Sequence, residues 1–328
     1  MQTGFFLTRW LFLAMRWLYE SVTNESIVLT VIIATIFIRL VTVVGDIKSR
    51  ESSMKMAAIQ PQLDKIRKKY EKDPNKLNME QRKVMKENNV SMMGGCLPML
   101  FTLPLFFMFI AAFRQWGTEM MVKLILLMDS DPAAGLEFFE NFKFLWINNM
   151  WAADNGFKPV IAPLRDFLVN AKNLPSYLFF RDNPGALDAM VRLGFLIPDA
   201  AEKSGYALAA VSDALTNTYD TLLAPCAEVY AGRNNGWFIL PVVGAGTTFL
   251  SSWLMMRKQP KTDAAANSNK LMQYLMPAMT LWVCLSSNSA FALYWTTSNV
   301  LSMGTSLIIN RIFEKKYGKP TTVEVKKA

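Results

Sequence analysis

Five long apolar stretches divide the chain, and charged segments separate them. About 20 consecutive apolar residues are enough for a helix to cross the hydrocarbon core of a bilayer. The uncharged run from 271 to 310 is too long for one helix, and the turn-forming residues Ser286–Ser289 are expected to divide it. The pattern predicts an all-α, multi-pass membrane protein with five transmembrane helices, at 27–46, 96–117, 237–256, 271–286 and 290–310.

Residues 1–26 are expected to form an amphipathic helix at the membrane interface. Arg9, Arg16 and Glu20 follow one another at seven and four residues and share one helical stripe, opposite a face rich in Trp and Phe. A cleaved signal peptide is the alternative, but it needs a basic n-region and a small-residue cleavage site. The segment shows neither, so we favour the interfacial helix.

Three polar segments and one long insert connect the spans. Residues 47–92 predict a basic helical hairpin, because apolar positions from Met56 to Tyr70 recur every three or four residues and Asp73–Asn75 interrupts the pattern. Residues 257–270 predict a short loop, and residues 311–328 a basic tail. Residues 118–236 predict a mostly helical extramembrane insert, and the sequence assigns no role to its part from 157 to 235.

The charge distribution predicts the topology. The net charge is +9, and the basic residues gather in the hairpin (twelve), the loop 257–270 (four) and the tail (six). The insert 118–236 instead holds nine basic and fourteen acidic residues. Because cytoplasmic loops carry an excess of Lys and Arg, we expect the hairpin and C-terminus in the cytoplasm and the N-terminus outside.

The inventory of reactive side chains argues against an enzyme. The chain has no histidine, which excludes His-based acid–base catalysis and His-ligated metals. Its three cysteines form neither a CxxC motif nor a disulfide framework. With 52% hydrophobic residues and no nucleotide-binding motif, we expect neither cofactor, metal nor catalytic residue.

Arg39 is the one basic residue well inside an apolar stretch. An arginine at the centre of a membrane helix costs roughly 2.5–3.5 kcal/mol on insertion scales. It could snorkel, since the cytoplasmic end lies only about 10 Å away at 1.5 Å per residue. It could instead line a water-filled cavity. No acidic residue lies within the apolar stretches, so Arg39 is expected to have no ion-pair partner there, which favours the cavity.

Three further features each allow a structural and a functional interpretation. The hairpin is either a solvated, salt-bridged helix pair or a mobile basic element that touches lipid headgroups and incoming chains. Its methionines suit adaptable surfaces, although gap-filling in a core explains any single one equally well. Tyr294-Trp295-Thr296-Thr297 could line a groove or belong to an interfacial aromatic belt.

Several runs together resemble the YidC family of membrane-protein insertases, relatives of the mitochondrial Oxa and chloroplast Albino proteins. The resemblance covers about 240 of the 328 residues in order. The matching runs are Met54-Lys55-Met56, Gln60-Pro61, the KKY at 68–70, Lys86-Glu87, GGCLP at 94–98, Phe144-Leu145-Trp146-Ile147, Tyr274-Leu275-Met276-Pro277 and Leu293-Tyr294-Trp295.

The resemblance implies a hydrophilic, cytoplasm-facing groove with Arg39 at the position of the family's groove arginine. Where family members often carry Gln, this chain has Thr102 and Ser251-Ser252, so shorter hydroxyls would line the groove. The implied client-binding residues are Arg39, Thr102, Ser251, Ser252, Tyr294 and Trp295, and the implied hairpin residues are Met54, Lys55, Met56, Gln60 and Pro61.

The resulting hypothesis is an insertase in the bacterial plasma membrane that moves short polar segments of nascent membrane proteins across the bilayer. Its expected partners are nascent chains, the ribosome, anionic lipids and, where it does not work alone, the Sec translocon. The alternative is an ion channel or small-solute transporter, which predicts paired ionisable residues across several spans. An intramembrane enzyme and a structural membrane subunit are weaker alternatives.

Overall fold

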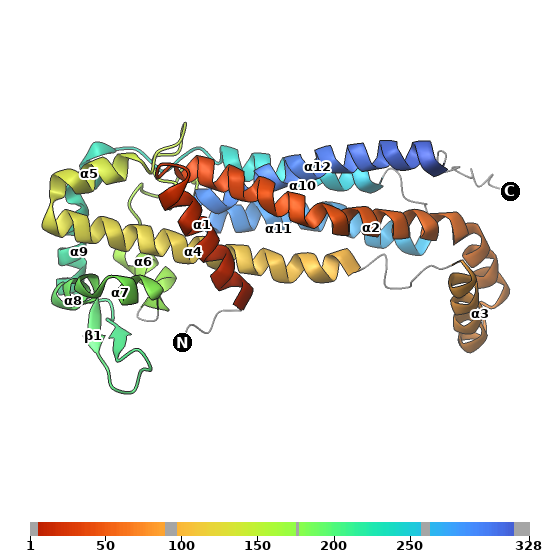
Figure 1. Cartoon of the computed structure of the whole chain (residues 1–328), viewed down its shortest axis with the longest axis horizontal. Coiled ribbons are helices and arrows are strands. Elements are labelled where there is room, and N and C mark those ends of the chain that lie inside the picture. Colours follow the sequence, from red (N-terminus) through yellow and green to blue (C-terminus); the bar gives the residue numbers. More distant parts are fainter. Residues whose placement is uncertain (1–5, 89–96, 175–176, 257–262, 318–328) are drawn as a thin grey trace. The chain divides into compact units, whose positions relative to one another are not determined.

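The computed structural model describes residues 6–88, 97–174, 177–256 and 263–317, and these residues are mainly helical (Figure 1). The predicted all-α class is confirmed apart from one small β-hairpin. The helices are α1 (Phe6–Ser21), α2 (Ile27–Lys69), α3 (Pro74–Glu87), α4 (Leu97–Ser130), α5 (Pro132–Glu140), α6 (Leu164–Asn170), α7 (Leu178–Asp182), α8 (Pro184–Arg192), α9 (Asp213–Val229), α10 (Ile239–Met256), α11 (Asp263–Ser286) and α12 (Ser289–Tyr317).

The chain divides into two compact units. The first comprises residues 1–34, 107–244 and 279–296, and the second comprises residues 35–106, 245–278 and 297–328. The five long helices α2, α4, α10, α11 and α12 each contribute residues to both units.

In the second unit, α2 and α3 form the helical hairpin. α2 runs without a break from Ile27 to Lys69, so the predicted boundary between span and hairpin is not a helix end. The side chain of Asp73 accepts a hydrogen bond from the backbone N–H of Lys76 and caps α3, whose first residue is Pro74. Ile59 and Leu63 of α2 are buried against Val84 and Met85 of α3, so a small apolar core holds the hairpin closed.

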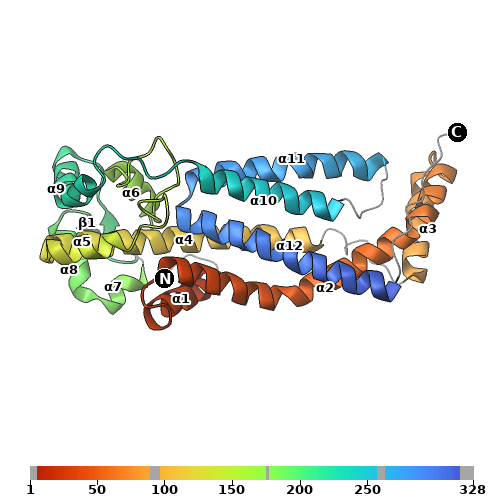
Figure 2. The same cartoon turned by 90° about the horizontal axis from the view of Figure 1, so that it is seen from above.

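In both views α10 and α11 run side by side (Figure 2). Within the second unit, the rings of Phe249 and Tyr274 lie 6.1 Å apart between them. α11 begins at Asp263, so 263–270 of the predicted loop is helical, while 257–262 lies outside the described residues. The same is true of 89–96, which includes part of the GGCLP run, and of 318–328 in the predicted tail.

In the first unit, α4 continues beyond the predicted span end at 117 as far as Ser130. The insert packs on this continuation: Thr118 Oγ1 donates to the carbonyl of Asn170, and the sulfur atoms of Cys226 and Met128 lie 3.7 Å apart. The insert also contains an antiparallel pair, β1 (Leu196–Pro198) and β2 (Tyr206–Leu208), which the sequence analysis did not predict. Strands of three residues are too short to produce a recognisable alternation.

α11 ends at Ser286 and α12 begins at Ser289, with the turn at the serine-rich run. Asn288 fixes it. Its Oδ1 accepts the backbone N–H of Phe291 at 3.0 Å, and its Nδ2 donates to the carbonyl of Phe113 at 2.8 Å.

Large apolar side chains point outward on the five long helices, although water would penalise such exposure. Examples are Phe37, Leu40 and Val44 on α2, Phe107 on α4, Val242 and Leu250 on α10, Leu275 and Trp282 on α11, and Leu307 and Ile308 on α12. Among the described residues, Ile27–Lys48 is the single helical stretch that is both long and apolar enough to cross a membrane, and Ile239–Leu254 is a shorter apolar helix. The count of five spans therefore stays a prediction.

Candidate functional site

Arg39 connects two helices of the second unit. Its Nε and Nη2 atoms both donate to Oγ of Ser298, at 3.1 and 2.9 Å. Ser298 lies on α12 and is buried, while 23% of the Arg39 side chain is exposed. Hydrogen bonds from a charged donor are stronger than neutral ones, so this fork fixes the guanidinium at the α2–α12 contact.

Asp46 lies close to the same guanidinium, which corrects the expectation that Arg39 has no ion-pair partner. The distance from Arg39 Nη1 to Asp46 Oδ2 is 3.7 Å. Asp46 directly follows Gly45, the last residue of the apolar stretch, and the apolar pattern therefore did not include it. On a helix, seven residues are nearly two turns, so the two side chains share one face. Asp46 is half-exposed, which makes this a weak pair.

A second polar contact lies next to the first on α12. Nδ2 of Asn299 donates to Oγ1 of Thr248 at 2.8 Å and lies 3.4 Å from Oγ1 of Thr247, both on α10. Adjacent residues of α12 thus bind α2 through Ser298 and α10 through Asn299. Neither residue was among the predicted site residues. The available signal was the unbroken polar run 296–299 inside an apolar span.

The predicted hydroxyl residues Ser251 and Ser252 lie on α10 and are half-buried. They follow Thr247 and Thr248 by four residues, so all four side chains share one face of the helix. The backbone of Thr102 belongs to α4, and its side chain lies outside the described part.

Tyr294 and Trp295 belong to the first unit, so the structure describes them apart from Arg39. Tyr294 is buried and its ring stacks on Phe109 with centroids 4.2 Å apart. The half-buried Trp295 stacks on Phe291 at 6.2 Å. Burial among rings is not the setting of a lipid-facing aromatic belt, the alternative that the sequence left open for Tyr294.

The predicted hairpin residues make local contacts. Lys55 pairs with Glu51 at 2.9 Å, and Nε2 of Gln60 donates to Asp64 Oδ1 at 3.2 Å. Met56 packs on the small hairpin core, Pro61 is exposed, and the side chain of Met54 lies outside the described residues. These pairs at four-residue spacing support the helix by a few tenths of a kcal/mol each.

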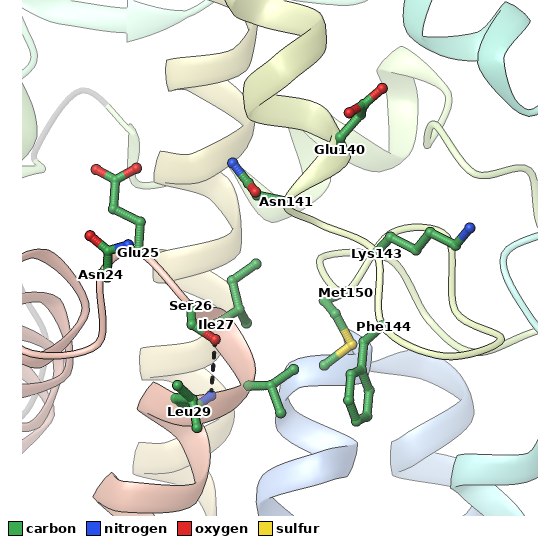
Figure 3. Close-up of a pocket in the computed structure, with 11 residues that line it drawn as sticks. Asn24, Glu25, Ser26, Ile27, Leu29, Glu140, Asn141, Lys143, Phe144 and Met150 are labelled. Atoms are coloured by element: carbon green, nitrogen blue, oxygen red, sulfur yellow. Dashed lines mark hydrogen bonds between the residues drawn. The ribbon is translucent and has the colours of Figure 1, made fainter.

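A shallow cavity of about 420 Å³ lies in the first unit, where α2 begins (Figure 3). Residues 24–29 line one side, and Glu140, Asn141, Lys143, Phe144 and Met150 line the other. Its charged lining residues are Glu25, Glu140 and Lys143, a mixture of signs that favours no one kind of ligand. None of the predicted groove residues lines this cavity.

The sequence profile of the 60Kd inner membrane protein family matches residues 17–316. The membrane protein insertase YidC of Clostridium perfringens is 32% identical over 142 residues, which cover 43% of this chain and 51% of that protein. The YidC insertase of Chlorobium luteolum is 26% identical over 300 residues, 90% of this chain and 35% of that protein, and the one of Clostridium tetani is 21% identical over 292 residues, 89% and 85%. The matched region thus spans about half of the first relative and about a third of the second.

Proposed function

Because the chain belongs to the 60Kd inner membrane protein family, the family of the YidC insertases, we propose that this membrane protein inserts other membrane proteins into the bilayer. Its clients would be nascent chains with a short polar segment beside a transmembrane helix. The polar segment is staged against Arg39, and the apolar helix then passes into lipid. No enzymatic step is needed, because transfer of apolar surface from water into lipid is favourable by itself.

One observation carries the proposal: a guanidinium that is only 23% exposed sits among helices whose outward faces are apolar. An isolated charge in hydrocarbon is expensive, and so is an unpaired carboxylate or peptide group of a client. Each reduces the cost of the other when they meet. The charge of Arg39 is positioned but not neutralised at close range, because Ser298 is a neutral acceptor and the carboxylate of Asp46 is 3.7 Å away.

The surrounding hydroxyls extend this polar surface along α10 and α12. Thr247, Thr248, Ser251 and Ser252 follow one face of α10, and Asn299 joins that face to α12. Hydroxyl and amide groups can exchange hydrogen bonds with a passing peptide, because each both donates and accepts. We propose this face, with Thr102, as the path of the polar segment. Tyr294 and Trp295 remain client-binding residues that the family resemblance implies.

The basic hairpin is proposed to face the cytoplasm, where Lys and Arg side chains favour anionic headgroups. There it would meet ribosome-bound nascent chains, with or without the Sec translocon. The N-terminus would then lie outside and the C-terminus inside.

Photocrosslinking tests the proposal with a control on the same helix. A photoreactive amino acid at position 39 should crosslink a ribosome-bound client at its polar segment. Position 37 carries an outward-facing side chain only two residues away and should not reach that segment. Equal crosslinking of the polar segment from both positions would overturn the groove.

The transporter alternative requires ionisable pairs across several spans. The ion pair of Arg39 lies within one helix. Purified protein in liposomes should therefore insert a client without raising ion conductance or solute uptake, and conductance that depends on Arg39 would favour the alternative.

A further inference from the structure

The chain enters and leaves the insert 157–235 through a neck, which we define as residues 143–158 and 233–239. The backbone N–H of Asn235 donates to the carbonyl of Lys158 at 3.0 Å, and Pro159 and Asn234 form an isolated β-bridge. The side chain of Asn235 bonds the backbone N–H and carbonyl of Asn149 at 2.7 and 2.8 Å. The two ends of the insert therefore meet where α10 begins.

A buried carboxylate organises this neck. Asp154 Oδ1 accepts the backbone N–H groups of Trp237 and Phe238 at 2.8 and 3.0 Å, and Oδ2 accepts Leu240 N–H at 2.7 Å and Trp146 Nε1 at 3.1 Å. Asp154 is fully buried by these contacts. Asp154 therefore connects the neck segment 143–158 to the neck segment 233–239 and to the first turn of α10.

Three large apolar side chains project from this fixed frame. Phe157 is 87% exposed, Trp237 is 74% exposed and Leu145 is 65% exposed. The hydrogen bonds to Asp154 fix the backbone near each of them. Trp237 donates its own backbone N–H to Asp154, and Leu145 precedes Trp146, whose indole also donates to it. The ring of Phe157 lies 5.2 Å from the ring of Phe238, another donor.

The backbone conformation at Leu145 indicates that the fold holds the leucine side chain in its exposed position. Its φ is +53°, in the left-handed region that favours glycine or asparagine. The tight bridge between Phe144 and Ile147 holds Leu145 at the tip of the turn. In water, an exposed leucine gains nothing from that conformation.

The charges of the neck favour one kind of partner. Its exposed charged residues are Lys143, Arg233 and Lys158, of which Lys158 pairs with Asp166 at 3.0 Å, and its one acidic residue, Asp154, is buried. The insert 118–236 as a whole is acidic in balance. Trp237 and Phe157, whose ring lies 5.2 Å from that of Phe238, stand at the start of α10, where Ile239 and Val242 are also exposed. Aromatic and aliphatic tips with basic neighbours suit the headgroup region of an anionic bilayer.

We propose that Leu145, Phe157 and Trp237 form a bilayer anchor, which inserts the neck into the leaflet where α10 begins and holds the insert at the membrane surface. The partner is phospholipid, with the basic residues at the phosphate level and the three tips below it. The anchor is separate from the Arg39 site and does not rest on the insertase proposal.

Spin labels at positions 145 and 157 of the full chain test the anchor in vesicles of phosphatidylethanolamine and phosphatidylglycerol. Val169→Cys is the matched control, because Val169 is an apolar residue of the insert outside the neck and is 69% exposed. Replacement of Cys96 and a labelled sample with no introduced cysteine account for background labelling. We expect oxygen to relax labels 145 and 157 more than a water-soluble nickel complex does, and the reverse at 169.

Labels at 145 and 157 that are as open to the nickel complex as the label at 169 would overturn the anchor. A lipid-to-protein titration separates lipid from a second copy of the chain. If protection of labels 145 and 157 from the nickel complex is unchanged when the protein is diluted in lipid, lipid covers them. If that protection disappears on dilution, the surface forms contacts between copies of the chain, and the proposal is wrong. Client insertion plays no part in either readout, so the insertase proposal can fail while the anchor stands.

Discussion

Arg39 and Ser298 lie 259 positions apart in the sequence, yet one hydroxyl oxygen accepts two hydrogen bonds from the guanidinium. Replacing Ser298 with Ala removes the acceptor and leaves a charged donor partly buried. A hydrogen bond to a charged group contributes about 1.5–3 kcal/mol, so the melting temperature in detergent should fall. Ser306→Ala, two turns further along α12, is the control and should change it little. Equal shifts in both variants would show that the fork contributes no stability.

The ion pair between Arg39 and Asp46 allows a charge-swap test. Arg39→Glu places two carboxylates on one face of α2 and should abolish insertion of clients with acidic segments. Asp46→Asn should preserve insertion, because the pair is half-exposed and contributes no more than about 1 kcal/mol.

The double variant Arg39→Glu/Asp46→Arg decides between a structural and a client-binding role. It restores the ion pair but not the fork to Ser298, and it places the positive charge nearly two turns from its original position. We expect the melting temperature to rise above that of Arg39→Glu by the small contribution of the pair, while client insertion, measured by protease protection in vesicles, does not recover. Recovery of insertion would mean that Arg39 acts only as a structural partner of Asp46.

The helical class could be predicted from the sequence because long apolar runs and the breaks at Asp73–Asn75 and Ser286–Ser289 are local signals. Arg39 could be selected for the same reason, as a charge in an apolar run. Ser298 and Asn299 stand out as part of the polar run 296–299, but their role could not be predicted, since a neutral polar residue in a span gains meaning only from the neighbour it faces. Their partners lie on α2 and α10, and the rotation of α12 that brings them together is a tertiary property.

The role of Asp154 was hidden by distance along the chain. Helix caps are found by inspecting the residue just before a helix, but Asp154 precedes its partner Trp237 by 83 positions. The insert between them obscures the cap. The ion pair of Arg39 was not predicted because Asp46 lies one residue past the apolar stretch. A helix brings positions 39 and 46 onto one face.

The Asp154 frame predicts a large loss of stability on truncation. Asp154→Ala leaves three backbone N–H groups at the start of α10 and the Trp146 indole without their acceptor. Loss of an N-cap costs about 0.5–2 kcal/mol, and each buried unsatisfied group about 1–3 kcal/mol. Asp154→Asn retains one carboxamide oxygen and should lose less. Thermal unfolding in detergent should rank wild type above Asn above Ala, and equal melting of wild type and Ala would contradict the frame.

Glu119 predicts how stability depends on pH. Its side chain on α4 is only 5% exposed, and burial raises its pKa from 4.5 to about 7, although Gln115 donates a hydrogen bond to Oε1 at 3.1 Å. The folded state therefore holds the proton more tightly than the unfolded state. The stabilisation is fully present below about pH 4.5 and is lost as the pH rises to about 7, by roughly 3 kcal/mol at 1.4 kcal/mol per pKa unit.

Glu119→Gln keeps an acceptor for Gln115 and removes the titration. Melting temperatures between pH 4.5 and 8 should fall more steeply for wild type than for the variant. Glu137→Gln, an exposed control on α5, should retain the wild-type slope, and the same slope in Glu119→Gln would contradict the assignment.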